Sequence, residues 1–145
     1  MPRSAPAHGP GHLPVLPRGG QAAGLRRPRP TFSSSGVGSL RPGYSVYVAS
    51  KAKAAVEVMT KILAREPRGT GIVTANVVAP GSTGTPMFYT GKTADERGGA
   101  ERYVAEALLG RLGMPEDIAP LVGFLASDAG HWVKAQVLRC NGGTI

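Results

Sequence analysis

The sequence predicts an α/β fold built on a parallel β-sheet. Its clearest strand is residues 72–79, IVTANVVA, an apolar and β-branched run of the kind that is buried on both faces of such a sheet. Residues 31–35 and 135–140 are shorter β-like runs, and helical patterns lie between the three. Strands that alternate with helices along a chain are typical of α/β domains.

The first strand is expected to begin only at Thr31. Pro28 and Pro30 precede it, and proline has no backbone N–H to give to a ladder of hydrogen bonds. Residues 1–30 are rich in proline and glycine and have no strand or helix period, which predicts a disordered tail. The folded part should therefore span residues 31–145.

Three helices are expected, over residues 44–64, over residues 100–109 and from Pro115 onward. Pro67 ends the first, and Pro115 begins the third with two acidic residues that suit the helix dipole. The side chains expected to face the core are Ala55, Met59, Ile62 and Leu63 in the first helix and Val104, Ala107 and Leu108 in the second.

Charge and cysteine content exclude several classes of protein. The net charge is +8, of which five arginines in residues 1–30 supply +5. This tail lacks the interleaved aromatic residues and dense basic runs of a nucleic-acid or membrane-surface arm, so neither partner is expected. His8 and His12 have no acidic or thiol neighbours, and no metal site is expected. Cys140 is the only cysteine, which suits a reducing compartment, and a cytoplasmic location is expected.

A hydroxyl, a phenol and an ammonium can meet near the start of the first helix. Tyr47 and Lys51 are four residues apart and therefore share a helix face. A nearby cation favours the phenolate and lowers the pKa of a tyrosine. Ser34 lies thirteen residues before Tyr47, at the end of the first strand, and can reach the same point if strand and helix pack together. These three groups make a plausible proton-transfer site for a carbonyl or an alcohol.

Two stretches carry a family resemblance, SSSGVGSLRPGYSVYVASK and RLGMPEDIAPLVGFLASD. They resemble the active-site segment and a structural segment of the short-chain dehydrogenase/reductases. The resemblance implies the C-terminal half of a Rossmann-type, doubly wound parallel sheet, with about three strands and flanking helices. The first βαβ half is missing, because the chain has no G-x-G-x-x-G turn for a cofactor pyrophosphate.

The resemblance also implies roles for single residues. Ser34, Tyr47 and Lys51 would be catalytic, and Tyr47 and Lys51 would also contact the cofactor, NADP or NAD. The segment after the second strand would wrap the nicotinamide end of the cofactor through Pro80, Gly81, Ser82, Thr83 and Thr85, with Thr83 where valine is usual in the family.

Two functions remain open from the sequence. The first is an NAD(P)-dependent oxidoreductase acting on a small carbonyl or alcohol. The sequences of its GSLRPGYSVYVASK and PMFY segments are most similar to those of plant-type aldehyde or ketone reductases. The second is a truncated, non-catalytic fragment that serves at most as an oligomer partner. In either case the resemblance implies a possible homo-oligomer through the helix bearing Tyr47.

Two local features bear on the site. Compared with the family, Lys53–Ala54 resembles an insertion of two residues, and two residues rotate a helix by about 200° unless a bulge absorbs them. Residues 87–99 correspond to the substrate lid of the family. Met87, Phe88 and Tyr89 could line a substrate pocket there or anchor the loop to the core.

Overall fold

The computed structural model describes residues 27–40, 42, 45–50, 53–66, 72–90 and 100–144. The predicted disordered tail covers residues 1–30: residues 1–26, with His8 and His12, lie outside this described part, whereas residues 27–30 belong to a strand. Most of the lid segment, residues 91–99, also lies outside the described part.

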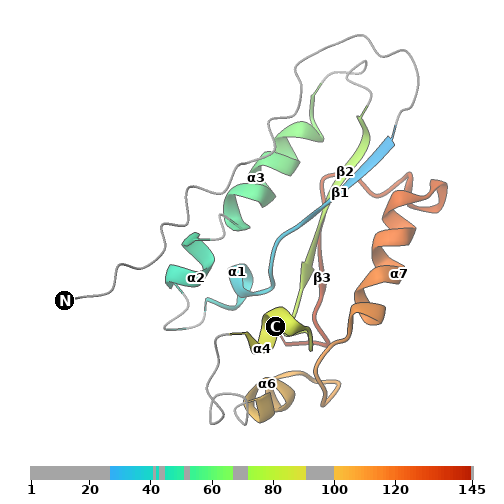
Figure 1. Ribbon diagram of the computed structural model, residues 1–145. Helices are drawn as coiled ribbons and strands as arrows, with labels where there is room; N and C mark the ends of the chain where they lie inside the picture. The colour runs from blue at the N-terminus through green and yellow to red at the C-terminus, as the bar shows by residue number, and fades with distance from the viewer. Residues whose placement is uncertain are drawn as a thin grey trace.

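Three parallel strands form the sheet of the described residues (Figure 1). Strand β1 spans Arg27–Phe32, β2 spans Ile72–Pro80 and β3 spans Val137–Cys140, with β2 in the middle. The register pairs Phe32 with Val78, and Val78 with Leu138. The predicted α/β class and the parallel sheet are thus confirmed.

Strand β1 begins four residues earlier than predicted, at Arg27, and contains both prolines. The reason is the direction in which each backbone N–H points. The N–H groups of Ser33 and Ser35 donate to the Val78 and Pro80 carbonyls of β2, so odd-numbered residues face β2. Even-numbered residues face away from β2 because successive backbone N–H groups point to opposite sides of a strand. Pro30 therefore removes a donor only on the side away from β2, and Pro28 lies where the β1–β2 register shifts, between Arg27 and Arg29.

Helix α7, Pro115–Ala126, packs on one face of the sheet and builds the main apolar core. Val78 of β2 meets Ile118 and Leu125 there, all three of them buried. Pro115 occupies the first turn as predicted. A short 3₁₀ turn, η1 at Asp128–Gly130, follows α7 and leads to β3.

The opposite face is covered by α3 with α2 beside it, and both fall within the single helix expected over residues 44–64 (Figure 1). Helix α2 spans Ser45–Ser50 and α3 spans Lys53–Leu63, and residues 51–52 between them lie outside the described part. A four-residue helix, α1 at Gly36–Ser39, connects β1 to this layer. The expected insertion at Lys53–Ala54 falls at the start of α3, and its effect on the helix stays a prediction.

Helix α3 buries only part of its predicted apolar face. Ala55 and Ile62 were expected inward but are exposed, Met59 and Leu63 are half-buried, and Thr60 and Ala64 are buried. Thr60 Oγ1 lies 2.9 Å from Thr31 Oγ1 of β1, so a polar contact lies on the side of the helix that faces the sheet.

Two small helices follow β2 at the carboxyl end of the sheet, α4 at Pro86–Tyr89 and α6 at Ala100–Glu106. Helix α6 is shorter than predicted, so Leu108 leaves the helical period and is exposed rather than buried.

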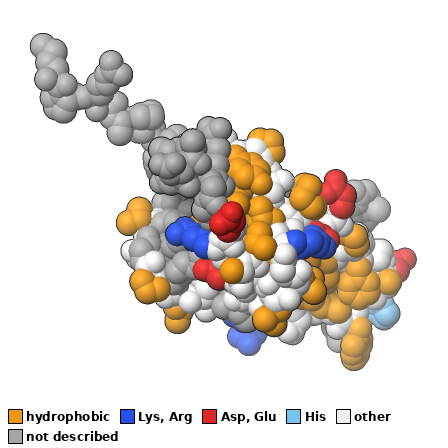
Figure 2. Space-filling view, turned by 90° about the horizontal axis from the view of Figure 1, so that it is seen from below, with side chains coloured by type: hydrophobic (Ala, Val, Ile, Leu, Met, Phe, Trp, Pro, Cys, Tyr) orange, Lys and Arg blue, Asp and Glu red, His pale blue; other side chains and the backbone are white. Residues whose placement is uncertain are grey.

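Figure 2 looks onto this end of the molecule and shows hydrophobic side chains spread over it between a few charged ones. Within the described residues, every helix is too short or too polar to cross a membrane.

Candidate functional site

The predicted site residues that the structure describes include two at the ends of strands. Ser34 follows β1 by two residues and Gly81 follows β2 directly, while Asn141, which was not predicted as a site residue, follows β3. The carboxyl ends of parallel strands meet at one edge, which is where open α/β sheets bind their ligands.

Ser34 is the most available of three consecutive serines. The hydroxyl of Ser33 donates to Glu57 Oε1 at 2.6 Å, and that of Ser35 donates to the Ala79 carbonyl at 2.9 Å. Ser34 Oγ instead accepts a hydrogen bond from the Gly36 N–H at 3.1 Å, and Ser34 is only half-buried. Its own proton can therefore be given to another acceptor, as a hydroxyl that binds a carbonyl oxygen requires.

The turn after Ser34 lies against the helix that contains Tyr47. A Cβ on Gly36 would lie 3.3 Å from Ser34 Oγ and 3.8 Å from Val48 Cγ2 of α2. Tyr47 precedes Val48 in α2, but its side chain and the whole of Lys51 lie outside the described part. The convergence of Ser34, Tyr47 and Lys51 stays a prediction.

The predicted cofactor loop, residues 80–85, is held on two sides by backbone hydrogen bonds. The Gly81 N–H donates to the Cys140 carbonyl at 3.0 Å. The Gly113 N–H donates to the Ser82 carbonyl at 3.0 Å, and the Gly84 N–H donates to the Gly113 carbonyl at 2.8 Å. The loop is therefore fixed to β3 and to the segment before α7, which makes it a preformed wall at the end of β2.

The two threonines of this loop have different tasks. Thr83 donates its hydroxyl to the Gly81 carbonyl at 3.0 Å, so its polar group is satisfied within the loop. Thr85 caps α4, and its Oγ1 accepts a hydrogen bond from the Phe88 N–H at 3.3 Å. Because that bond uses an oxygen lone pair, the Thr85 proton can be donated to a ligand, which fits the predicted contact with a carboxamide.

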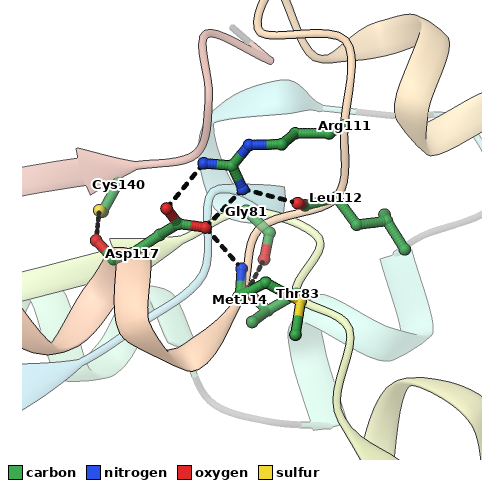
Figure 3. A network of polar contacts seen from close by, with 7 residues as sticks. All are labelled: Gly81, Thr83, Arg111, Leu112, Met114, Asp117 and Cys140. Carbon is green, nitrogen blue, oxygen red and sulfur yellow. Dashed lines mark hydrogen bonds and ion pairs between the residues drawn. The ribbon is translucent and has the colours of Figure 1, made fainter.

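Behind the loop lies a charged network that the sequence analysis did not identify (Figure 3). Arg111 Nη1 and Nη2 donate to Asp117 Oδ2 and Oδ1 at 2.6 and 2.7 Å, and the Met114 N–H donates to Oδ2 at 2.7 Å. The bonds from Arg111 and then from Met114 hold the pKa of Asp117 well below its usual range. The position of Asp117 in the first turn of the predicted helix was the available signal, since a carboxylate there can cap the helix.

Cys140 ends β3 close to this network. Its Sγ lies 3.3 Å from the Asp117 carbonyl oxygen, and burial, followed by the charge of Asp117, raises the pKa of the thiol. The side chain of Cys140 is half-buried.

A cavity of about 190 Å³ lies between the loop and the end of β3. Gly81–Thr83 and Cys140–Gly142 form two of its walls. Pockets for drug-sized ligands usually measure roughly 300–1,000 Å³, so this cavity is too small for a dinucleotide.

The aromatic residues after the loop pack on one another and on α6, while the choice between lining a substrate pocket and anchoring the loop to the core stays a prediction. The ring of Phe88 meets those of Tyr89 and Tyr103 edge-on, with centroids 5.0 and 5.2 Å apart, so Phe88 anchors α4 to α6. Met87 is exposed. A Cβ on Gly84 would lie 3.6 Å from the Tyr89 hydroxyl, so Tyr89 reaches back over the cofactor loop.

Comparisons with known proteins agree with this arrangement. Residues 30–144 match the sequence model of the family described as Enoyl-(Acyl carrier protein) reductase. An NADPH-dependent aldehyde reductase-like chloroplastic protein of Arabidopsis thaliana is 52% identical over 114 residues, which are 79% of this chain and 40% of that protein. A short-chain type dehydrogenase/reductase of Picea abies is 55% identical over the same shares.

A solved structure is similar as well. The short-chain dehydrogenase/reductase of Brucella melitensis, a glucose/ribitol dehydrogenase, has a TM-score of 0.67 and 28% identity, with 80% of this chain and 44% of that one covered. The chain thus spans about 40% of the length of the curated relatives it matches. With three parallel strands, flanking helices and a family match over residues 30–144, this chain belongs to the short-chain dehydrogenase/reductase family.

Proposed function

We propose that the chain serves in NADP-dependent reduction of a small carbonyl compound. The observation that carries this proposal is that the turn after Ser34 lies against the helix bearing Tyr47, while the Ser35 N–H donates to the carbonyl of Pro80, where the Gly81–Thr85 loop begins. Two similar plant proteins are named NADPH-dependent aldehyde reductases or reductase-like proteins, which favours NADP over NAD and an aldehyde as the substrate class.

Each residue has a distinct role in this proposal. The Ser34 hydroxyl holds the carbonyl oxygen of the substrate, and Tyr47 donates the proton to that oxygen. Lys51 favours the phenolate form of Tyr47 and binds ribose hydroxyls. The bound cofactor supplies the hydride.

The described residues fit one end of such a cofactor. Pro80, Gly81, Ser82 and Thr83 form a fixed wall, and Thr85 has a hydroxyl proton to donate. The sequence contains no G-x-G-x-x-G turn for the phosphates. The chain alone should therefore bind NADPH very weakly, because the phosphate contacts supply much of a dinucleotide's binding.

A second candidate is a non-catalytic fragment of the family. It is favoured by the share of the relatives that the chain spans, about 40% of their length. On this reading the fold and the apolar surface of α3 persist, while the chemistry does not.

Fluorescence titration with NADPH, followed by an aldehyde-reduction assay, tests both candidates. Under the first, reduction is measurable at high NADPH and is abolished by Tyr47→Phe, while Ser45→Ala, an exposed position two residues earlier, leaves it unchanged. Ser34→Ala should lower the rate, and Ser35→Ala is its neighbour control. Activity that survives Tyr47→Phe would contradict the proposed chemistry, and absence of both binding and reduction would favour the fragment.

We also propose a cytoplasmic location, from the single cysteine. Two of the similar proteins are named as chloroplastic. A fluorescent fusion of the chain, imaged against a chloroplast marker, decides between the two compartments.

A further inference from the structure

We propose that Ser33 and Glu57 are a positioning pair, which sets the helix after the Tyr47–Lys51 segment against the strand end that carries Ser34. The inference rests on the proposed function for its catalytic consequence only. Neither residue is offered as catalytic, because the structure gives each a contact with the other and not with a reacting group.

The contact itself is short and shielded from solvent. Ser33 is 4% exposed, and its hydroxyl donates to Glu57 Oε1 at 2.6 Å. The same hydroxyl lies 3.3 Å from the Lys53 carbonyl oxygen, in the first turn of α3. A hydrogen bond to a carboxylate is roughly twice as strong as one between neutral groups, so this contact outweighs an ordinary polar contact between a strand and a helix.

A second contact between β1 and α3 lies beside the first and restricts the rotation of α3 about its own axis. Thr31 precedes Ser33 by two residues and so shares its face of β1, and its Oγ1 lies 2.9 Å from Thr60 Oγ1. Thr60 follows Glu57 by three residues, on the same side of α3. Two contacts along one helix fix its rotation about its own axis as well as its distance from β1.

Rotation matters here because of where the candidate residues lie along the chain. Ser34 directly follows Ser33, and Lys51 is two residues before Lys53. The Ser33–Glu57 contact is made by α3, which begins two residues after Lys51. A pair that fixes α3 against the end of β1 should therefore help to keep the proposed hydroxyl and the proposed ammonium in register.

Hydrogen exchange of the full chain tests the pair without any need for activity. Ser33→Ala and Glu57→Ala should each speed exchange of the amides in the first turn of α3 and in α1 by about tenfold or more, the loss of a hydrogen bond to a charged group. Because both substitutions remove the same contact, the double variant should exchange no faster than either single variant. Glu57→Gln, which keeps an acceptor oxygen, should restore most of the protection. Glu66→Ala, at an exposed position after α3, is the matched control.

Kinetics then separate the two claims. If the proposed function holds, Ser33→Ala and Glu57→Ala should lower kcat about tenfold with KM for the aldehyde nearly unchanged, and Glu57→Gln should recover it. Additive effects on exchange, or no effect, would overturn the positioning pair whatever the activity. Coupled exchange in a chain without reductase activity would support the pair and would count against the proposed function alone. If the alanine variants do not fold, the exchange of Glu57→Met decides, because methionine keeps the length of the side chain without the acceptor oxygen, and full protection in that variant overturns the pair.

Discussion

Arg111 binds both carboxylate oxygens of Asp117, at 2.6 and 2.7 Å, on the surface beside the candidate cofactor loop. The same carboxylate accepts the Met114 N–H at the start of α7. One side chain therefore joins the loop-supporting segment to the helix that builds the core.

The network of Arg111, Asp117 and Met114 predicts that part of the free energy of unfolding is lost in acid. The pKa of Asp117 is lowered in the folded chain. The carboxylate therefore contributes to the free energy of unfolding in full above the ordinary pKa of roughly 4, and this contribution is lost as the pH falls below that value. Asp117→Asn should lower the thermal midpoint at pH 7, and the difference from the unmodified chain should shrink steadily below about pH 4. Thermal unfolding followed by circular dichroism across this range measures the effect. Asp128→Asn, at an exposed position in η1, is the control, and a difference independent of pH would contradict the assignment.

Cys140 should be a slow thiol. Burial and the neighbouring charge raise its pKa, so less thiolate is present at pH 7 than in an unstructured peptide. A maleimide or disulfide reagent should modify Cys140 more slowly than a free cysteine peptide, with a rate that keeps rising above about pH 8.5. Asp117→Asn should speed the reaction because it removes the nearby negative charge. The single cysteine makes the measurement unambiguous, and a rate equal to that of the peptide would refute the prediction.

Gly81 should be intolerant of any side chain. A Cβ there would lie 2.8 Å from both Cα and Cβ of Asn141, so the loop and the end of β3 must separate. Gly81→Ala should cost about 1–3 kcal/mol in the free energy of unfolding, the usual range for overpacking. Gly123 in α7 is the matched control, because nothing lies within 4 Å of its Cβ position and alanine should stabilise the helix by about 0.5–1 kcal/mol. Urea denaturation of both variants tests the pair, and equal effects would argue against the close approach at Gly81.

The outer face of α3 should mediate self-association. Val58 and Ile62 are four residues apart on this helix, and each is 58% exposed. The family resemblance implies a possible homo-oligomer through the helix bearing Tyr47, which was expected over residues 44–64 and so includes the residues of α3. Burying Val58 and Ile62 in such an interface would be favourable. The chain should be a dimer or larger by light scattering, and Val58→Glu with Ile62→Glu should make it monomeric. Trp132→Glu, a charge placed at another exposed apolar residue, should leave the oligomer intact.

The sequence predicted correctly the elements whose residue pattern fits one kind of structure only. The run at 72–79 became β2, and Pro115 with its following acids became the start of α7. The Gly81–Thr85 loop also follows β2 as expected.

The sequence failed where a residue's effect depends on direction or on a distant partner. A rule against proline in ladders does not say which way its nitrogen points, so the start of β1 was misplaced at Thr31. The apolar period of α3 does not reveal that Thr60 pairs with Thr31 across 29 residues. Nor does spacing alone join Arg111 to Asp117, six residues apart and across the start of a helix.

The prolines of β1 have a consequence for assembly. Among the described residues β1 borders the sheet, and a further strand laid along its outer side would find carbonyl oxygens at Pro28 and Pro30 but no N–H groups. Half of the bonding pattern that such an incoming strand needs is therefore missing over this stretch. Natural sheets use proline at an edge strand to resist growth into fibres, so the outer edge of β1 should discourage edge-to-edge aggregation. The face of α3 that carries Val58 stays open to specific partners.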